Sequence, residues 1–206
     1  SQNKEIGSWT DHLSYSRGTS IDTDGKNIFC GTTSGLFIYN NEDFSVQRKN
    51  KINGLSEVNI QKVGYNSQTK VLLIIYRSGN IDLYRGGNIY TLPFIKNNTS
   101  INNKSINEIY FKGDYAYLAF SFGIVVIDTK KNEIMATYSL GGSNTSIKIN
   151  ATVLINNIIF AATDEGVFYG NSEDNLLDFN NWNKINTHNN SKIENIFELN
   201  KKAIYV

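Results

Sequence analysis

The side chains with the most suggestive chemistry in this sequence are Tyr76 and Arg77, which stand side by side just before a Ser-Gly turn. An aromatic platform beside a planar cation suits recognition of a sugar or of an anionic headgroup. Rigid elements would have to hold such a site, because binding residues gather in loops that a scaffold positions. The alternative for each of these residues is an ordinary solvated loop side chain. The predicted ligand-binding set is Arg17, Tyr76, Arg77, Lys104, Ser121 and Asp164.

The residue types give little support for catalysis or for metal binding. Histidine occurs only as His12 and His188, and Cys30 is the single cysteine, so no ligand set with zinc-site spacing exists. Neither histidine has a recognisable nucleophile partner, and the sequence has no G-x-S-x-G motif. Cys30 follows Phe29 in an apolar segment, where a free cysteine packs as a small apolar residue. We therefore expect no enzyme activity, no catalytic residue, no metal and no cofactor.

The segment from Asp22 to Asn27 is the one stretch that suggests a calcium loop. An EF-hand loop needs glycine at its sixth position and glutamate at its twelfth. Here Gly25 occupies the fourth position and Thr33 the twelfth. Because other parts of the chain have turns at the corresponding place, the pattern favours a plain hairpin turn, in which glycine accepts a positive φ.

The elements that would position the candidate site repeat along the chain. Two apolar, β-branched segments flank a short polar turn that contains glycine, and this pattern occurs four times. The turn glycines lie 44, 44 and 43 residues apart (79−35, 123−79, 166−123): Gly35, Gly79, Gly123 and Gly166. Periods of about 40 to 50 residues with four short strands are typical of propeller blades. The turns between second and third strands would then open on one face, together with the loops that enter each first strand.

The predicted fold is an all-β propeller of four-stranded blades, with about four and a half blades over residues 1–206. Trp9 and Trp182 support this register, since each falls where an outer strand belongs. We expect this to be part of a longer, seven-bladed ring, and a five-bladed ring closed by both termini is the alternative. The inner strands are expected near residues 19–23, 58–64, 106–111, 148–154 and 193–199.

Composition narrows the class of partner. The chain carries 20 basic and 19 acidic residues, for a net charge of +1, which does not favour nucleic acid. The sequence has no run of about 18 apolar residues, so we expect no membrane-spanning helix. The first residues also lack a basic segment followed by an apolar core, so we expect that an export signal has been removed.

Several motifs resemble one known family. Asn53-Gly54-Leu55-Ser56, Gly79-Asn80-Ile81-Asp82-Leu83 and Phe122-Gly123-Ile124-Val125-Val126 are similar to the N-terminal propeller of the PorZ proteins of the type IX secretion system. The Gly-Leu-Phe pattern at Gly35 is shared with the two-component regulator propellers. The resemblance implies a protein of the cell surface or outer membrane that contacts other secretion-system proteins. It also implies a role in cargo processing and attachment, with anionic lipopolysaccharide or another glycan as a ligand. The alternative is the extracytoplasmic, glycan-sensing propeller of a hybrid two-component receptor.

Overall fold

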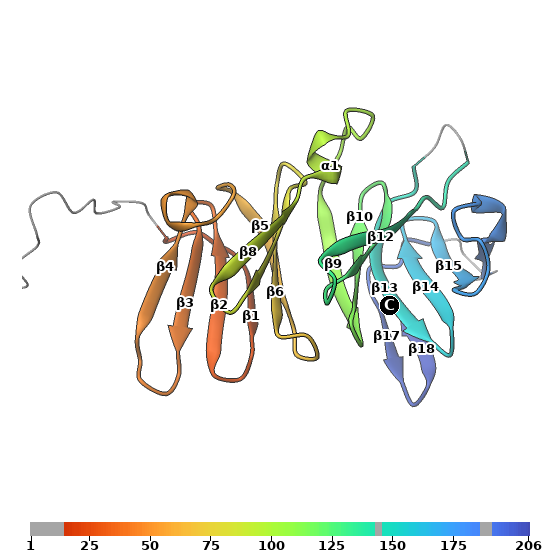
Figure 1. Ribbon diagram of the computed structural model, residues 1–206. Helices are drawn as coiled ribbons and strands as arrows, with labels where there is room; N and C mark the ends of the chain where they lie inside the picture. Colours follow the sequence, from red (N-terminus) through yellow and green to blue (C-terminus); the bar gives the residue numbers. More distant parts are fainter. Residues whose placement is uncertain (1–14, 143–145, 186–190) are drawn as a thin grey trace, which may run out of the picture.

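The computed structural model describes residues 15–142, 146–185 and 191–206, and these residues form an all-β fold (Figure 1). They contain five antiparallel sheets, of which four have four strands each and the last has two. The strands of every sheet are paired in chain order, as in propeller blades. The predicted fold class, a partial propeller of four-stranded blades, is confirmed.

The strands of the first three sheets alternate with tight turns. The first sheet contains β1 (Gly18–Thr23), β2 (Asn27–Thr32), β3 (Leu36–Asn40) and β4 (Val46–Lys49). The second contains β5 (Ile60–Asn66), β6 (Val71–Tyr76), β7 (Ile81–Arg85) and β8 (Asn88–Leu92). The third contains β9 (Ile106–Lys112), β10 (Tyr115–Phe120), β11 (Gly123–Asp128) and β12 (Glu133–Tyr138).

The fourth sheet contains β13 (Ile149–Ile155), β14 (Ile158–Thr163), β15 (Gly166–Asn171) and β16 (Asn183–Lys184), and the fifth contains β17 (Ile196–Leu199) and β18 (Lys202–Tyr205). Three short helices lie between strands: η1 (Lys51–Asn53), α1 (Phe94–Asn97) and η2 (Phe179–Asn181). Three first strands begin later than the ranges expected from sequence: β5 at Ile60, β13 at Ile149 and β17 at Ile196. Glu194 and Asn195 precede β17, and their backbone N–H groups donate to the carbonyl of Val206.

The first strands of consecutive sheets lie next to one another, β1 beside β5, β5 beside β9, β9 beside β13 and β13 beside β17. They are therefore the inner strands, and the sheets face one another in sequence order (Figure 1). Apolar side chains fill each interface between successive sheets. The largest of these cores, between the second and third sheets, includes Leu73, Ile75, Leu118 and Phe120, all of them fully buried.

The turn glycines allow the fourth strand to approach closely. Gly35 and Gly123 have φ of 158° and 151°, a region in which other residues are strained. A Cβ atom at Gly35 would stand 2.2 Å from the carbonyl oxygen of Lys49, and one at Gly123 would stand 2.1 Å from that of Tyr138. Gly79 and Gly166 also have positive φ, of 84° and 120°, so the turn of each of these four sheets has a backbone conformation that favours glycine.

Each of the first four inner strands has a β-bulge, and the bulged residue binds the next sheet. At these positions the pairing with the second strand skips one residue, so that side chain turns toward the neighbouring inner strand. In each case it donates a hydrogen bond, of 2.6 to 3.4 Å, to the carbonyl of an isoleucine one sheet further on. The pairs are Thr19 with Ile60, Gln61 with Ile106, Asn107 with Ile149, and Asn150 with Ile193. These bonds satisfy backbone carbonyls at or just before the start of the next inner strand.

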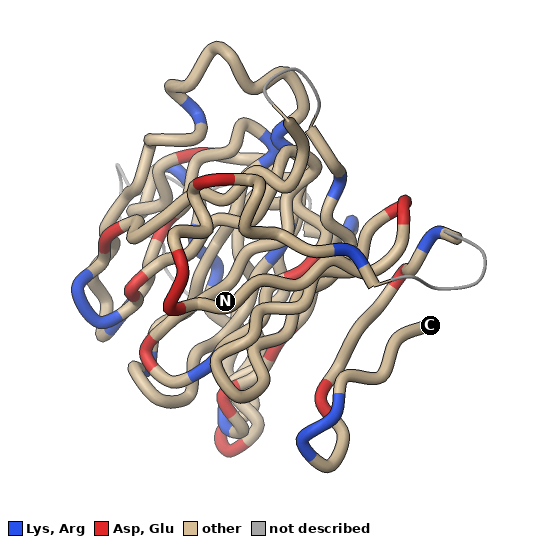
Figure 2. The backbone as a smooth tube through the Cα atoms, turned by 90° about the vertical axis from the view of Figure 1, so that its right-hand side faces the viewer, with Lys and Arg blue, Asp and Glu red and all other residues tan. Residues whose placement is uncertain are grey.

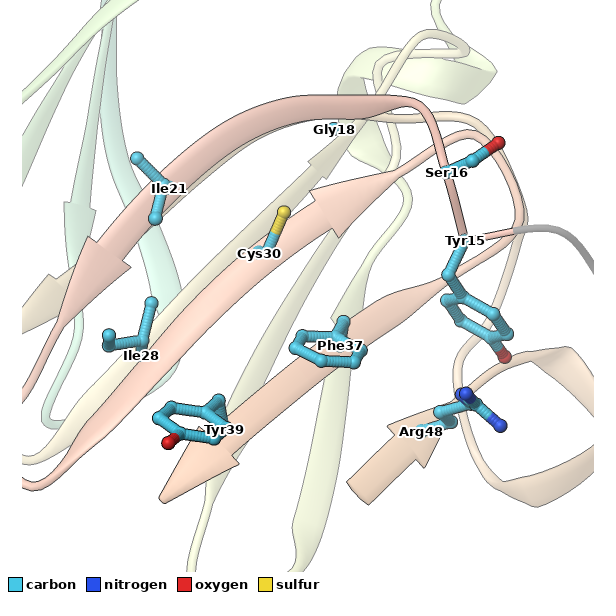
Figure 3. A pocket seen from close by; sticks show the side chains of 9 residues that line it. All are labelled: Tyr15, Ser16, Gly18, Ile21, Ile28, Cys30, Phe37, Tyr39 and Arg48. Atoms are coloured by element: carbon cyan, nitrogen blue, oxygen red, sulfur yellow. The ribbon is translucent and has the colours of Figure 1, made fainter. Parts of the chain in front are cut away.

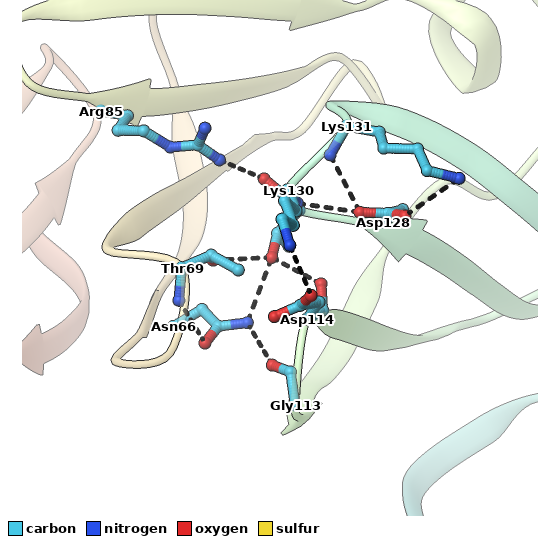
Figure 4. A network of polar contacts seen from close by, with 9 residues as sticks. Asn66, Thr69, Arg85, Gly113, Asp114, Asp128, Lys130 and Lys131 are labelled. Carbon is cyan, nitrogen blue, oxygen red and sulfur yellow. Dashed lines mark hydrogen bonds and ion pairs between the residues drawn. The ribbon is translucent and has the colours of Figure 1, made fainter.

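A polar cluster joins the second and third sheets at the turns that follow β5 and β11 (Figure 4). The hydroxyl of Thr129, which is fully buried, lies 2.8 Å from that of Thr69 and accepts a 3.1 Å hydrogen bond from the amide of Asn66. The same hydroxyl donates to the carbonyl of Asp114 at 2.6 Å, and the guanidinium of Arg85 donates to the carbonyl of Thr129. The cluster therefore links both sheets through one buried side chain.

Candidate ligand-binding rim

One end of the strands, which we call the rim, carries two sets of loops. These are the turns between second and third strands and the loops that enter the inner strands. Backbone hydrogen bonds tie them together: the N–H of Arg77 donates to Asn59 at 3.1 Å, and that of Ser121 to Ser105 at 2.9 Å. The N–H of Asn59 in turn donates to Thr33 of the preceding sheet at 2.9 Å. These bonds restrain the rim loops within the second and third sheets and link the first sheet to the second.

The prediction that Tyr76 offers an exposed aromatic platform is wrong. Its side chain is fully buried, and its hydroxyl donates a 2.6 Å hydrogen bond to the carboxylate of Asp82, which is also fully buried. That carboxylate accepts two further bonds, from the N–H of Ser56 and from the hydroxyl of Thr91, at 2.9 and 2.7 Å. Burial, and then the charge of Asp82, raise the pKa of Tyr76. Tyr76 thus holds the rim loop from inside instead of contacting a ligand.

Arg77, by contrast, is exposed, and it lines a polar cavity of about 450 Å³. The cavity lies at the inner strands of the first and second sheets, and its lining is Thr19, Ser20, Gln61, Lys62, Arg77 and Ile106. In the part of the chain that the structure describes, the Arg77 guanidinium has no hydrogen-bond or ion-pair partner. Its five N–H donors are available to an anion or to a sugar hydroxyl.

Lys62 supplies a second cation to the same cavity. Its side chain is half-buried, and its ammonium donates one hydrogen bond to the carbonyl of Asn107. Burial lowers the pKa of Lys62, and the nearby carboxylate of Glu108 opposes that effect. Burial also raises the pKa of Glu108, although its carboxylate accepts a 2.8 Å bond from the N–H of Thr152. Lys62 is thus a charge held away from water with incomplete compensation.

The other predicted residues are less available. The ammonium of Lys104 donates to the carbonyl of Lys96 at 2.7 Å, and Ser121 is half-buried beside Ser105. The carboxylate of Asp164 accepts a 2.8 Å bond from Asn150 and lies 3.8 Å from the ammonium of Lys148. Arg17 is exposed immediately before β1. The structure therefore brings only Arg77 of the predicted set into the cavity.

Sequence reasoning missed Lys62 and Gln61 as candidate site residues. Both lie within the predicted second inner strand, where side chains were expected to be structural. A signal did exist, since Lys62 is a basic residue at an inner-strand position where the other repeats have Ser20, Glu108 and Ala151. The tertiary arrangement was still needed to show that Lys62 and Arg77 line one cavity.

A larger cavity, of about 740 Å³, lies on the face of the first sheet that points away from the second (Figure 3). Side chains of β1, β2 and β3 form its floor, among them Ile21, Ile28, Cys30, Phe37 and Tyr39. The guanidinium of Arg48 lies 5.5 Å from the ring centroid of Tyr15 at its edge. We call this surface the open face of the first sheet. Its apolar lining suits packing against protein more than recognition of a charged ligand.

The metal-binding and catalytic candidates have other surroundings. Within residues 15–142, 146–185 and 191–206, no three His, Cys, Asp or Glu side chains lie close enough together to hold a metal ion. The carboxylate of Asp24 is engaged by the turn, accepting bonds from the N–H groups of Lys26 and Asn27 and from the Asn27 amide. His12 and His188, like Trp9, fall outside the described residues. The helices of the described segments include none that is long and apolar enough to cross a membrane.

Charge is distributed in small groups over the molecule. Figure 2 shows basic and acidic residues interspersed, many of them in the turns between strands. Several exposed groups pair with each other, such as Lys26 with Glu42 and Lys192 with Glu194. Such pairs cancel most of the local field, so recognition of an anion depends on the few cations without a partner.

Comparison with known proteins identifies the family. The sequence of residues 28–183 matches the family described as the PorZ N-terminal beta-propeller domain of the type IX secretion system. The chain belongs to this family. No individual curated protein matches it in sequence. PorZ of Porphyromonas gingivalis, described as an essential bacterial surface component of that system, has a similar structure, with a TM-score of 0.85 and 25% sequence identity. That similarity covers 94% of this chain and 26% of the chain of that PorZ.

Sensor proteins share the propeller fold of this PorZ family. The extracellular domain of a putative hybrid two component system from B. thetaiotaomicron, BT4673, has a TM-score of 0.65 at 16% identity, over 95% of this chain and 26% of its own. A second such domain, BT3049, has a TM-score of 0.64 at 17% identity, over 92% and 25%. The chain thus spans about a quarter of the length of these solved structures.

Proposed function

We propose that this chain is the propeller of a PorZ-like component exposed at the cell surface or outer membrane. There it contacts other proteins of the type IX secretion system and binds anionic lipopolysaccharide or a related acidic glycan. Both contacts serve the processing and surface attachment of secreted cargo. Membership of the PorZ family supports the secretion role, and the surface location of the P. gingivalis relative supports the location.

The unpartnered guanidinium of Arg77 is the observation that carries the ligand-binding part of this proposal. Ion pairing among the described rim residues engages Lys96 with Glu57 and Lys148 with Asp164. Arg77 instead lines a cavity whose volume is typical of small-molecule sites. Planar guanidinium groups bind carboxylates and phosphates through two parallel hydrogen bonds.

The proposed activity is binding and not catalysis. The cavity is lined by two cations, two hydroxyls, an amide and one apolar side chain. This set contains no carboxylate and no histidine that would serve as a general base. It suits recognition of a negatively charged group without chemical change.

A sensor role is the second candidate, because extracellular sensor domains share the fold. The full-length reading frame separates the two roles. A second propeller followed by a C-terminal secretion signal would support the secretion role, whereas a membrane-spanning helix followed by a kinase domain would support the sensor.

The binding proposal is tested by replacing Arg77 with Ala and measuring the affinity of the protein for purified anionic lipopolysaccharide. We expect the affinity to fall about tenfold, since a hydrogen bond to a charged group contributes about 1.5–3 kcal/mol. Arg48→Ala is the matched control, because it removes the same charge from an exposed arginine outside the rim. Equal affinities of the wild type and Arg77→Ala would contradict the rim site.

A further inference from the structure

The second sheet departs from the repeat at two positions, and both departures introduce a cation. The residue after the inner-strand bulge is Lys62 in the second sheet, where the other sheets have Ser20, Glu108 and Ala151. The residue two places before the turn glycine is Arg77, where the others have Thr33, Ser121 and Asp164. Because those sheets fold without a cation at either position, the scaffold does not require Lys62 or Arg77.

Two of the three other side chains at the Lys62 position, those of Ser20 and Glu108, accept a hydrogen bond from the next inner strand, and the third residue is Ala151. The Ser20 hydroxyl accepts a 3.1 Å hydrogen bond from the N–H of Val63, and Glu108 accepts one of 2.8 Å from the N–H of Thr152. An acceptor in each case satisfies a backbone donor of the next inner strand. An ammonium group cannot accept a hydrogen bond, so Lys62 gives up this structural contact.

Lys62 and Arg77 line the same cavity although they lie on different elements. Lys62 belongs to the inner strand β5, and Arg77 follows the last residue of β6. Lys62 has three ammonium donors and uses one of them on Asn107. Arg77 has no partner among the residues described. Two cations thus converge on one polar space with donors to spare.

The charge around this space indicates the charge of its ligand. Lys62 and Arg77 contribute two positive charges, and Glu108, which faces Lys62, contributes one negative charge. Glu57, a carboxylate of the loop that enters β5, is paired with Lys96 and accepts a hydrogen bond from the Ser78 hydroxyl. One positive charge is therefore left to be balanced, which favours a monoanionic group such as a carboxylate over a dianionic phosphate.

The neutral lining suits the remainder of such a ligand. The Thr19 hydroxyl lies 2.9 and 2.8 Å from the carbonyl oxygens of Gly31 and Ile60, which share its single O–H donor, so its position is fixed. The Gln61 side chain reaches the carbonyl of Ile106 at 3.4 Å through its amide nitrogen. Its amide oxygen is left as an acceptor for a sugar hydroxyl. Ile106 adds an apolar side chain to the lining.

We infer that this cavity binds the carboxylate of an acidic sugar between Arg77 and Lys62. The inference rests on the proposed function and narrows it to one chemical group at one place on the rim. It assigns a binding role to the second sheet alone, since the fourth sheet pairs its own rim charges, Lys148 with Asp164.

The test is a calorimetric titration of the protein with three probes: D-glucuronate, glucose 6-phosphate and glucose. We expect glucuronate to bind at least about tenfold more tightly than glucose, and more tightly than glucose 6-phosphate. Lys62→Met and Arg77→Gln should each weaken glucuronate binding about tenfold, and Lys62→Arg should retain most of it. Lys148→Met, which removes a rim lysine that is paired with Asp164, should leave the affinity unchanged. Urea unfolding of each variant verifies that it is folded.

Three outcomes would overturn the inference: equal binding of glucuronate and glucose, tighter binding of glucose 6-phosphate, or full affinity in folded Lys62→Met. The lipopolysaccharide assay distinguishes this failure from failure of the proposed function. If Arg77→Ala weakens lipopolysaccharide binding while Lys62→Met does not, the rim function stands and the carboxylate site is wrong. If the wild type binds no lipopolysaccharide, the proposed function is wrong, and the glucuronate titration still decides whether the cavity is a carboxylate site.

Discussion

We call the interface between the second and third sheets the seam. Equivalent positions of one repeat form the seam and the open face of the first sheet. Ile28 and Cys30 of β2 correspond to Leu72 and Ile74 of β6, 44 residues later (72−28, 74−30). Leu72 and Ile74 are buried against the preceding sheet, whereas Ile28 and Cys30 are partly exposed in the 740 Å³ cavity. Leu118 of β10 occupies the same position as Ile74 and is fully buried in the seam.

This comparison shows that a strand of this kind has no fixed burial of its own. Alternation places one set of side chains on each face of a sheet, but only a neighbouring sheet removes a face from water. The seam also has a polar component, the cluster around Thr129, which links the two sheets away from the apolar core. The open face has apolar lining without such a cover among the described residues.

The largest difference between the two regions should appear when the equivalent side chains are truncated. Leu118→Ala removes a fully buried side chain from the seam, and we expect the free energy of unfolding to fall by about 2–5 kcal/mol. Cys30→Ala at the equivalent position of the open face should change it by less than about 1 kcal/mol. Urea denaturation followed by tryptophan fluorescence measures both values. Losses of similar size would show that the open face is as tightly packed as the seam.

A smaller loss is expected from the polar cluster of the seam. Thr129→Val keeps the shape of the side chain but removes the hydroxyl that bonds to Asn66, Thr69 and Asp114. The buried amide of Asn66 loses one partner, so the free energy of unfolding should fall by about 1–3 kcal/mol. Thr33→Val, at a rim turn of the first sheet, serves as the control and should change stability by about 0.5 kcal/mol or less. If the two valine variants are equally stable, the cluster does not hold the seam.

The smallest effect concerns the chemical reactivity of Cys30, the only cysteine of the chain. Its thiol should react with a maleimide in the native protein, and Ile74→Cys in a Cys30→Ser background should react only on unfolding. Burial raises the pKa of the Cys30 thiol, so less thiolate is present at a given pH than in free cysteine. The labelling rate should therefore reach half its maximum at a higher pH than for a small thiol. Protection of Cys30 equal to that of residue 74 would mean that another part of the protein covers the open face.

The site residues illustrate how far the sequence pattern could be read. Tyr76 is the last residue of β6 (Val71–Tyr76), a continuous apolar segment whose six residues are all buried, so both faces of this strand are covered. Its neighbour Arg77 follows the strand and is exposed. An unbroken apolar run of this kind is typical of a strand that is buried on both faces, and Tyr76 belongs to the run whereas Arg77 does not.

The propeller itself was determined by the sequence, because the glycine period, the alternating apolar segments and the polar turns are local requirements of each blade. Gly35 and Gly123, for example, are needed because the fourth strand of the sheet passes too close to the turn to leave room for a Cβ atom. Lys62 and Arg77 have no such local relationship. They lie 15 residues apart (77−62) on different elements, and their shared cavity also depends on Thr19 of the first sheet and Ile106 of the third. Only the packing of three inner strands side by side brings these groups together. The repeat pattern does not specify that packing, because it depends on side chains that differ from one sheet to the next.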